Sequence, residues 1–209
     1  RPSTNGNTFA GLDNALVIRD FTIAVPLSFT GTTPGKGGIL YENDNAGTGA
    51  VISNTLDLGS VQRSINVEDN VSVANDLSLT GALTSAGGMV KSGAGTLLLA
   101  NSASTYAGNT AVENGSLILA SGLSDRLGTT GTLTLGAGST SGLLQLGDSS
   151  GLSNQTVTAL ASSGTGTTNA IVGGFTFALV RLGVAAWPWL ALCLAEIGRA
   201  SCRERVSSP

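Results

Sequence analysis

The sequence predicts an all-β protein built as a parallel β-helix, a solenoid of stacked coils. Thirty of its 209 residues are glycine and 4% are aromatic, and this composition favours many short strands joined by tight turns. Its apolar residues occur in short runs, each followed within a few residues by Gly, Asn or Asp. Strands this short become stable only when many of them stack, as the coils of a solenoid do.

A β-sandwich is the alternative fold, because the intervals between the apolar runs would also suit antiparallel strands. Asn114–Gly115 supports it, since Asn-Gly is the strongest two-residue hairpin signal. The lack of long paired strands and the predominance of Leu, Ile and Val over aromatic residues favour the solenoid.

Residues 1–36 are expected to hold irregular or partial N-terminal strands. Apolar residues cluster at 15–18, and an alternating run at 21–25 ends at Pro26, whose nitrogen cannot donate to a strand ladder. The chain begins at Arg1 and shows no basic, apolar and small-residue signal pattern. We therefore expect an internal fragment of a longer protein.

Residues 37–174 carry the regular strand pattern. Several short segments alternate strictly between apolar and polar residues, and this period of two places the apolar side chains on one face of a strand. The strict triplets are 56–58, 65–67, 71–73 and 77–79, and similar runs follow at 132–135, 142–146, 155–160 and 169–172.

The stretch Gly87–Leu119 is the clearest unit of this pattern and has the form of one repeat of a coil. Two short apolar strands, 97–99 and 117–119, are set among glycine and asparagine turns. The stretch resembles the autotransporter-associated β-strand repeat, from which it departs at Met89 and at 102–104. The residues on the pattern of that repeat are Gly87, Gly88, Lys91, Gly93, Gly95, Thr96, Leu97, Leu99, Tyr106, Gly108, Thr110, Val112, Gly115 and Leu117.

The resemblance implies a right-handed parallel β-helix in the passenger region of a secreted or surface-displayed bacterial protein. An outer-membrane translocator barrel would lie downstream of it and would provide the only contact with a membrane. The resemblance also implies structural roles for the repeat residues. The glycines would form turns, the Leu and Val side chains would face the interior, Tyr106 would cover an edge with its ring, and Lys91 would sit at a turn in water.

The composition excludes several kinds of site from residues 1–174. That segment contains no His, and both cysteines, Cys193 and Cys202, lie in the tail, so disulfides, Cys or His zinc sites and His-dependent triads are not available to it. The net charge of −3 lacks the clustered Lys and Arg that nucleic-acid binding needs. We expect no catalytic residue, no cofactor, no metal and no nucleic-acid partner.

A β-helical polysaccharide lyase or glycosidase is the alternative function, and it would need clustered carboxylates on an exposed face. The best candidates are Glu68, Asp69 and Asp76 near Arg63, although an acidic turn between two strands explains them more simply. Calcium-binding β-rolls need tandem Gly-Gly-x-Gly-x-Asp repeats, and here only the segment 146–148 suggests one.

The tail after Gly174 differs in composition from the rest of the chain. Residues 175–195 are apolar apart from Arg181 and are long enough to span a bilayer, but their origin is doubtful. Residues 196–206 resemble a translated sequencing adapter, so we expect 196–209 to be an artefact and tail. The sequence as a whole predicts a non-catalytic structural or adhesive passenger segment, located outside the cell, with a host-surface, matrix or glycan ligand as its possible partner.

Overall fold

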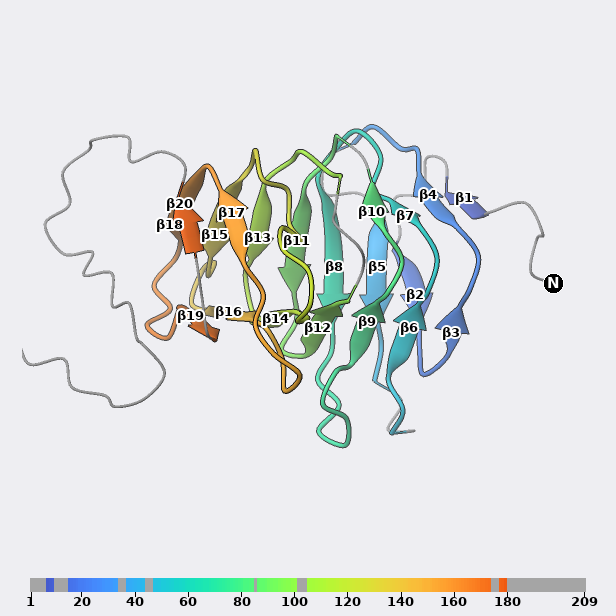
Figure 1. Ribbon diagram of the computed structural model, residues 1–209. Coiled ribbons are helices and arrows are strands. Elements are labelled where there is room, and N and C mark those ends of the chain that lie inside the picture. Colours follow the sequence, from blue (N-terminus) through green and yellow to red (C-terminus); the bar gives the residue numbers. More distant parts are fainter. Residues whose placement is uncertain are drawn as a thin grey trace, which may run out of the picture.

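The computed structural model describes residues 7–9, 15–33, 37–43, 47–84, 86–100, 105–173 and 177–179. All regular secondary structure within these residues is β-strand, which confirms the all-β prediction (Figure 1). No helix in the described part of the chain has the length and apolar character that crossing a membrane requires. The hydrophobic segment 175–195 and the adapter-like tail lie outside the described residues, except for the backbone of 177–179.

The strands form the stacked sides of a solenoid (Figure 1). What we call the first sheet contains β2 (Leu16–Ile18), β5 (Gly38–Tyr41), β8 (Arg63–Val67), β11 (Met89–Ser92), β13 (Thr110–Val112), β15 (Thr132–Leu135) and β18 (Ala159–Ser162). The second sheet contains β3 (Thr22–Ile23), β6 (Ala50–Ile52), β9 (Leu77–Leu79), β12 (Thr96–Leu99), β14 (Gly115–Leu119), β16 (Gly142–Leu146) and β19 (Ala170–Gly173). The third face contains β1 (Asn7–Phe9), β4 (Leu27–Phe29), β7 (Leu56–Asp57) and β10 (Leu83–Thr84), and further along the chain β17 (Gln155–Val157) with β20 (Phe177–Leu179).

Consecutive strands lie in different sheets, and every pairing between the named strands is parallel, as in β12 with β14. This arrangement confirms the parallel solenoid and excludes the antiparallel β-sandwich. Asn114–Gly115 is therefore not a hairpin, because β13 before it belongs to the first sheet and β14 after it to the second. The dipeptide forms the turn that leads from the first sheet to the second. We call this turn, in any coil, the first corner.

The solenoid includes residues before 37. Strands β2, β3 and β4 pair with β5, β6 and β7 of the following coil. At the other end, β20 pairs with β17 through Gln155 and Phe177. The described stack thus extends to both sides of the regular sequence pattern.

The stretch Gly87–Leu119 spans two successive coils, and the expectation of a single coil is wrong. It contains β11 and β12 and then β13 and β14, and Leu97 and Leu99 stand in register with Leu117 and Leu119. The sequence repeat is longer than one coil because the second half of the repeat stacks directly on the first.

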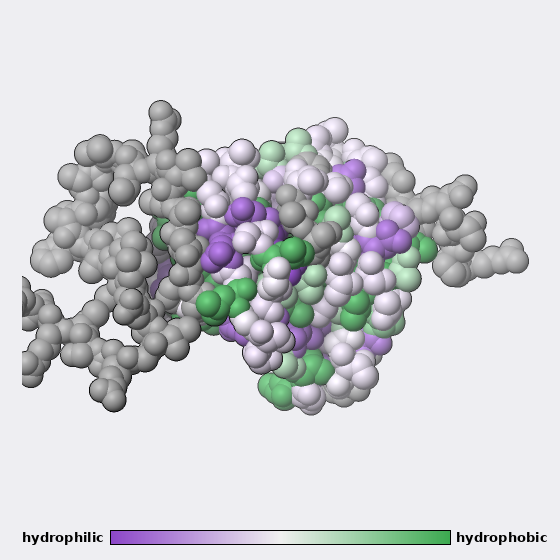
Figure 2. Space-filling view, in the orientation of Figure 1, coloured by the Kyte–Doolittle hydropathy of each residue, from purple (hydrophilic) through white to green (hydrophobic). Residues whose placement is uncertain are grey.

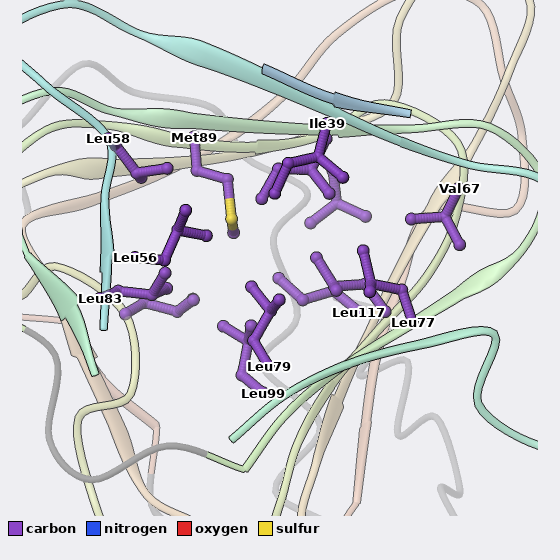
Figure 3. Packing of buried hydrophobic residues seen from close by; sticks show 14 of the residues in the cluster. Ile39, Leu56, Leu58, Val67, Leu77, Leu79, Leu83, Met89, Leu99 and Leu117 are labelled. Carbon is purple, nitrogen blue, oxygen red and sulfur yellow. The ribbon is translucent and has the colours of Figure 1, made fainter. Parts of the chain in front are cut away.

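The core is a set of aliphatic ladders inside the coils. Leu79 and Leu99 from the second sheet, Met89 from the first sheet and Leu56 from the third face point toward one another (Figure 3). Their side chains are essentially inaccessible to water. Each buried Leu side chain contributes about 1.5–3 kcal/mol of transfer free energy, so the ladders supply the main driving force for stacking.

Candidate functional site

The residues of the predicted repeat occupy the interior and the corners of two neighbouring coils. Leu97, Leu99, Val112, Leu117 and Leu119 are all fully buried. Thr96, at the start of β12, is only partly buried. These side chains form the stack itself, because they pack inside it and their strands pair from coil to coil.

Gly115 shows why the corner needs glycine. Its φ is 66°, a left-handed conformation that side chains disfavour. A Cβ at this position would lie 2.5 Å from the Gly95 carbonyl oxygen. The backbones of neighbouring coils thus touch at the first corner. The other repeat glycines also lie against the backbone of a neighbouring coil, namely Gly87, Gly88, Gly93, Gly95 and Gly108.

Lys91 does not sit at a turn in water, as the resemblance implied. Its exposed fraction is 0%, and its side chain lies in an inward row of the first sheet between Ile65 and Val112. Nζ donates to the carbonyl oxygens of Ser92 (3.1 Å), Gly93 (2.6 Å) and Asn114 (2.9 Å). The ammonium group therefore links the first corners of two successive coils.

Burial lowers the pKa of Lys91 to about 8. The carboxylates of Asp76 and Asp69 act in the opposite direction. The pKa of Lys91 falls nonetheless, because desolvation disfavours the charged form of a buried amine.

Tyr106 is also inside the coil and does not cover an edge. The side chain is buried, and Tyr106 Oη lies 2.5 Å from Thr110 Oγ1. Burial raises the pKa of Tyr106 to about 12. The ring fills the interior and its hydroxyl is satisfied by another residue of the repeat.

Two buried arginines, like Lys91, donate to main-chain carbonyl oxygens, but at other corners. Arg63 donates from Nε to Leu58 O at 3.1 Å and from Nη2 to Gly31 O, and its guanidinium lies over the Phe29 ring. Arg126 donates to Ala120 O at 2.8 Å and to Ser121 O at 2.9 Å. Burial lowers the pKa of both guanidinium groups. Cations inside the solenoid therefore bind main-chain carbonyl groups at or next to the corners.

A buried carboxylate accepts hydrogen bonds from main-chain N–H groups at the first corner. Asp76 accepts from the Asn70 main-chain N–H at 2.7 Å and from the Thr96 main-chain N–H at 2.6 Å. Earlier in the stack, Tyr41 Oη donates to Asp20 Oδ1 at 2.6 Å. Burial, followed by this contact, raises the pKa of Tyr41 to about 12. The first corner thus carries a polar column along an otherwise aliphatic interior.

The candidate carboxylates of a lyase or glycosidase do not form an exposed cluster. Asp76 is buried and bonded to main-chain groups, whereas Glu68 and Asp69 are exposed. Glu68 accepts from the Asn43 main-chain N–H at 3.1 Å. Arg63 opens β8 and the carboxylates follow its other end, so the proposed cation and carboxylates lie at opposite ends of that strand.

Asp148, the acidic residue of the β-roll-like segment 146–148, also accepts hydrogen bonds from the main chain of turns. Its carboxylate accepts from the Ser150 main-chain N–H at 2.8 Å and from the Ser121 main-chain N–H at 3.2 Å. These hydrogen bonds lower the pKa of Asp148. Within the described ranges, no group of three or more His, Cys, Asp or Glu side chains is placed to hold a metal ion.

Comparison with known proteins identifies the segment at the centre of this site. Residues 89–119 match the passenger-associated-transport-repeat family. The match confirms the resemblance of Gly87–Leu119 to an autotransporter passenger repeat. No curated protein and no solved structure matches the chain.

Proposed function

We propose that this chain is a non-catalytic structural and adhesive segment of a secreted or surface-displayed autotransporter passenger. The observation that carries the proposal is the position of the matched repeat. Residues 89–119 lie within an uninterrupted stack of parallel coils and supply rungs to both main sheets. A repeat of the passenger type is therefore used here as a stacking unit.

The mechanism of such a segment is geometric. Each coil adds about 4.8 Å along the axis, the spacing of neighbouring strands, and its backbone groups bond to the coils above and below. The result is a stiff rod that holds whatever it carries away from the cell. Rigidity comes from the interior ladders, so the outer side chains are free to vary.

The outer surface is suited to weak, extended contacts. Hydrophilic and apolar residues are interspersed on the face shown in Figure 2. Outward positions of the second sheet include Ser78 and Gln145 as well as Leu98 and Ile118. A host-surface, matrix or glycan ligand would bind across several coils of such a face.

The location is tested on intact cells of the source bacterium. Antibodies raised against the recombinant chain should label unpermeabilised cells or the culture medium. A matched antibody against a cytoplasmic protein of the same cells should label only after permeabilisation. Labelling by the first antibody only after permeabilisation would contradict the proposal.

The adhesive role is tested with the purified chain on immobilised collagen, fibronectin and mucin glycans. Saturable binding to one of these surfaces supports adhesion, and its absence from all of them leaves the structural role as the better account.

A glycan-depolymerisation assay tests the enzymatic alternative. Activity that is lost on Glu68→Gln and Asp69→Asn, two exposed carboxylates whose removal leaves the core intact, would replace our proposal with a lyase or glycosidase.

A further inference from the structure

At Asn114–Gly115, a main-chain nitrogen that can act as a nucleophile lies beside a side-chain amide. The Gly115 main-chain N–H donates to Asn114 Oδ1 at 2.9 Å, so the main-chain nitrogen lies next to the carboxamide of the preceding side chain. Glycine has no Cβ to hinder an approach between them. Both residues are only partly buried, and water can therefore reach the pair.

Lys91 acts on the same peptide group. Its Nζ donates to Asn114 O at 2.9 Å, and this oxygen belongs to the peptide bond that contains the Gly115 nitrogen. A cation at the oxygen stabilises the anion that forms when the nitrogen loses its proton, as charge-assisted donors stabilise other oxyanions. Because Lys91 is fully buried, bulk water screens this interaction little.

We propose that Asn114 is a site of spontaneous deamidation in the folded protein, promoted by Lys91. The Gly115 nitrogen, after losing its proton to solvent, forms a bond with Asn114 Cγ. The Cγ–Nδ2 bond breaks, and the amide nitrogen takes up one proton from water and leaves as ammonia. Water then opens the cyclic imide at either carbonyl, which gives aspartate or isoaspartate. The overall change replaces NH₂ by OH and needs no oxidant or reductant.

The product changes the first corner. Aspartate at 114 adds a negative charge close to Lys91. Isoaspartate lengthens the main chain by one atom where the backbones of neighbouring coils already touch, as the 2.5 Å approach of a Gly115 Cβ to Gly95 O indicates. We expect the modified chain to unfold at a lower denaturant concentration than the fresh chain.

The test follows Asn114 by mass spectrometry of proteolytic peptides during incubation at neutral pH. We expect Asn114 to convert in the folded chain and to convert roughly 10-fold more slowly in Lys91→Met, the factor that corresponds to one hydrogen bond to a charged group. The chain contains an internal reference, because Asn5–Gly6 is the same dipeptide. Its rate should be the same in both proteins. Arg19→Met, which removes an exposed cation, should leave the rate at Asn114 unchanged.

Two results overturn the proposal. One is an Asn114 that stays intact in the folded chain while it converts in denaturant, and the other is an equal rate in the wild type and in folded Lys91→Met. If circular dichroism shows that Lys91→Met does not fold, the wild type alone decides. The proposal then requires a higher ratio of conversion at Asn114 to conversion at Asn5 in native buffer than in denaturant, and an equal or lower ratio refutes it.

Discussion

Lys91 places a positive charge in a row whose neighbours are Ile65 and Val112. Moving an ammonium group out of water is costly unless hydrogen bonds replace its hydration. Here three carbonyl oxygens from two coils accept from Nζ. The side chain therefore acts as a polar cross-link whose removal would take three hydrogen bonds from partly buried carbonyl groups.

Lys91→Met should lower the free energy of unfolding by about 2–4 kcal/mol, because the methionine keeps the volume but loses the three hydrogen bonds that join the two coils. Chemical denaturation followed by circular dichroism measures the change. Arg19→Met is the matched control, since Arg19 pairs with Glu42 in a surface salt bridge that is worth less than about 1 kcal/mol. Equal effects of the two substitutions would show that Lys91 does not link the coils.

The pKa shifts predict a stability that rises with pH before it falls. The pKa of Lys91 is lowered from 10.5 to about 8, so between these values the unfolded chain binds a proton that the folded chain has lost. Over this interval the free energy of unfolding should increase, by up to about 3 kcal/mol. Tyr41 and Tyr106, with pKa values raised to about 12, act oppositely above the ordinary tyrosine pKa, because the unfolded chain then loses its tyrosine protons first.

Denaturation midpoints measured across this pH range should therefore pass through a maximum at about pH 10. Lys91→Met should lack the rise and keep the fall. A wild-type midpoint that stays level from pH 8 to 10 would show instead that the carbonyl oxygens keep Lys91 protonated.

At the scale of strands and corners, Gly115 needs to be glycine for two reasons, its positive φ and its close contact with the neighbouring coil. A substitution with a matched control distinguishes the two. Gly115→Ala should destabilise the chain by about 3 kcal/mol or more, since it adds backbone strain and forces two coils apart. Gly122→Ala is the matched control, because Gly122 also has a positive φ, 87°, but a Cβ there meets nothing within 4 Å. It should cost only about 1–2 kcal/mol. Similar losses in both variants would mean that the coils do not touch at Gly115.

The strands themselves could be predicted from the sequence because their alternation is local. The period of two that places Ile65 and Val67 inside also places Arg63 inside, and the same period relates Met89 to Lys91. The signal for these two buried cations was therefore present, but the usual preference of charged residues for water outweighed it. Arg126 lies between strands and has no such period, so only the stacked structure places it.

The resemblance alone could not show how the repeat divides between coils. The strands 97–99 and 117–119 look like two sides of one coil in the sequence, whereas they pair with each other in the second sheet. That pairing depends on where the chain turns. The decisive corner, Asn114–Gly115, carries the residues typical of a hairpin, and the contact of its backbone with the preceding coil selects the corner instead.

For the whole molecule, parallel register is the central claim, because the cation links and the proposed passenger function both depend on it. Disulfide trapping tests it most directly, in a background with Cys193→Ser and Cys202→Ser. Leu98 and Ile118 are in register on neighbouring coils, at a spacing that suits a disulfide. A hairpin at Asn114–Gly115 would instead bring Ala111 opposite Ile118. We predict rapid oxidation of the Leu98→Cys/Ile118→Cys pair and none of the Ala111→Cys/Ile118→Cys pair, and the reverse result would contradict the solenoid.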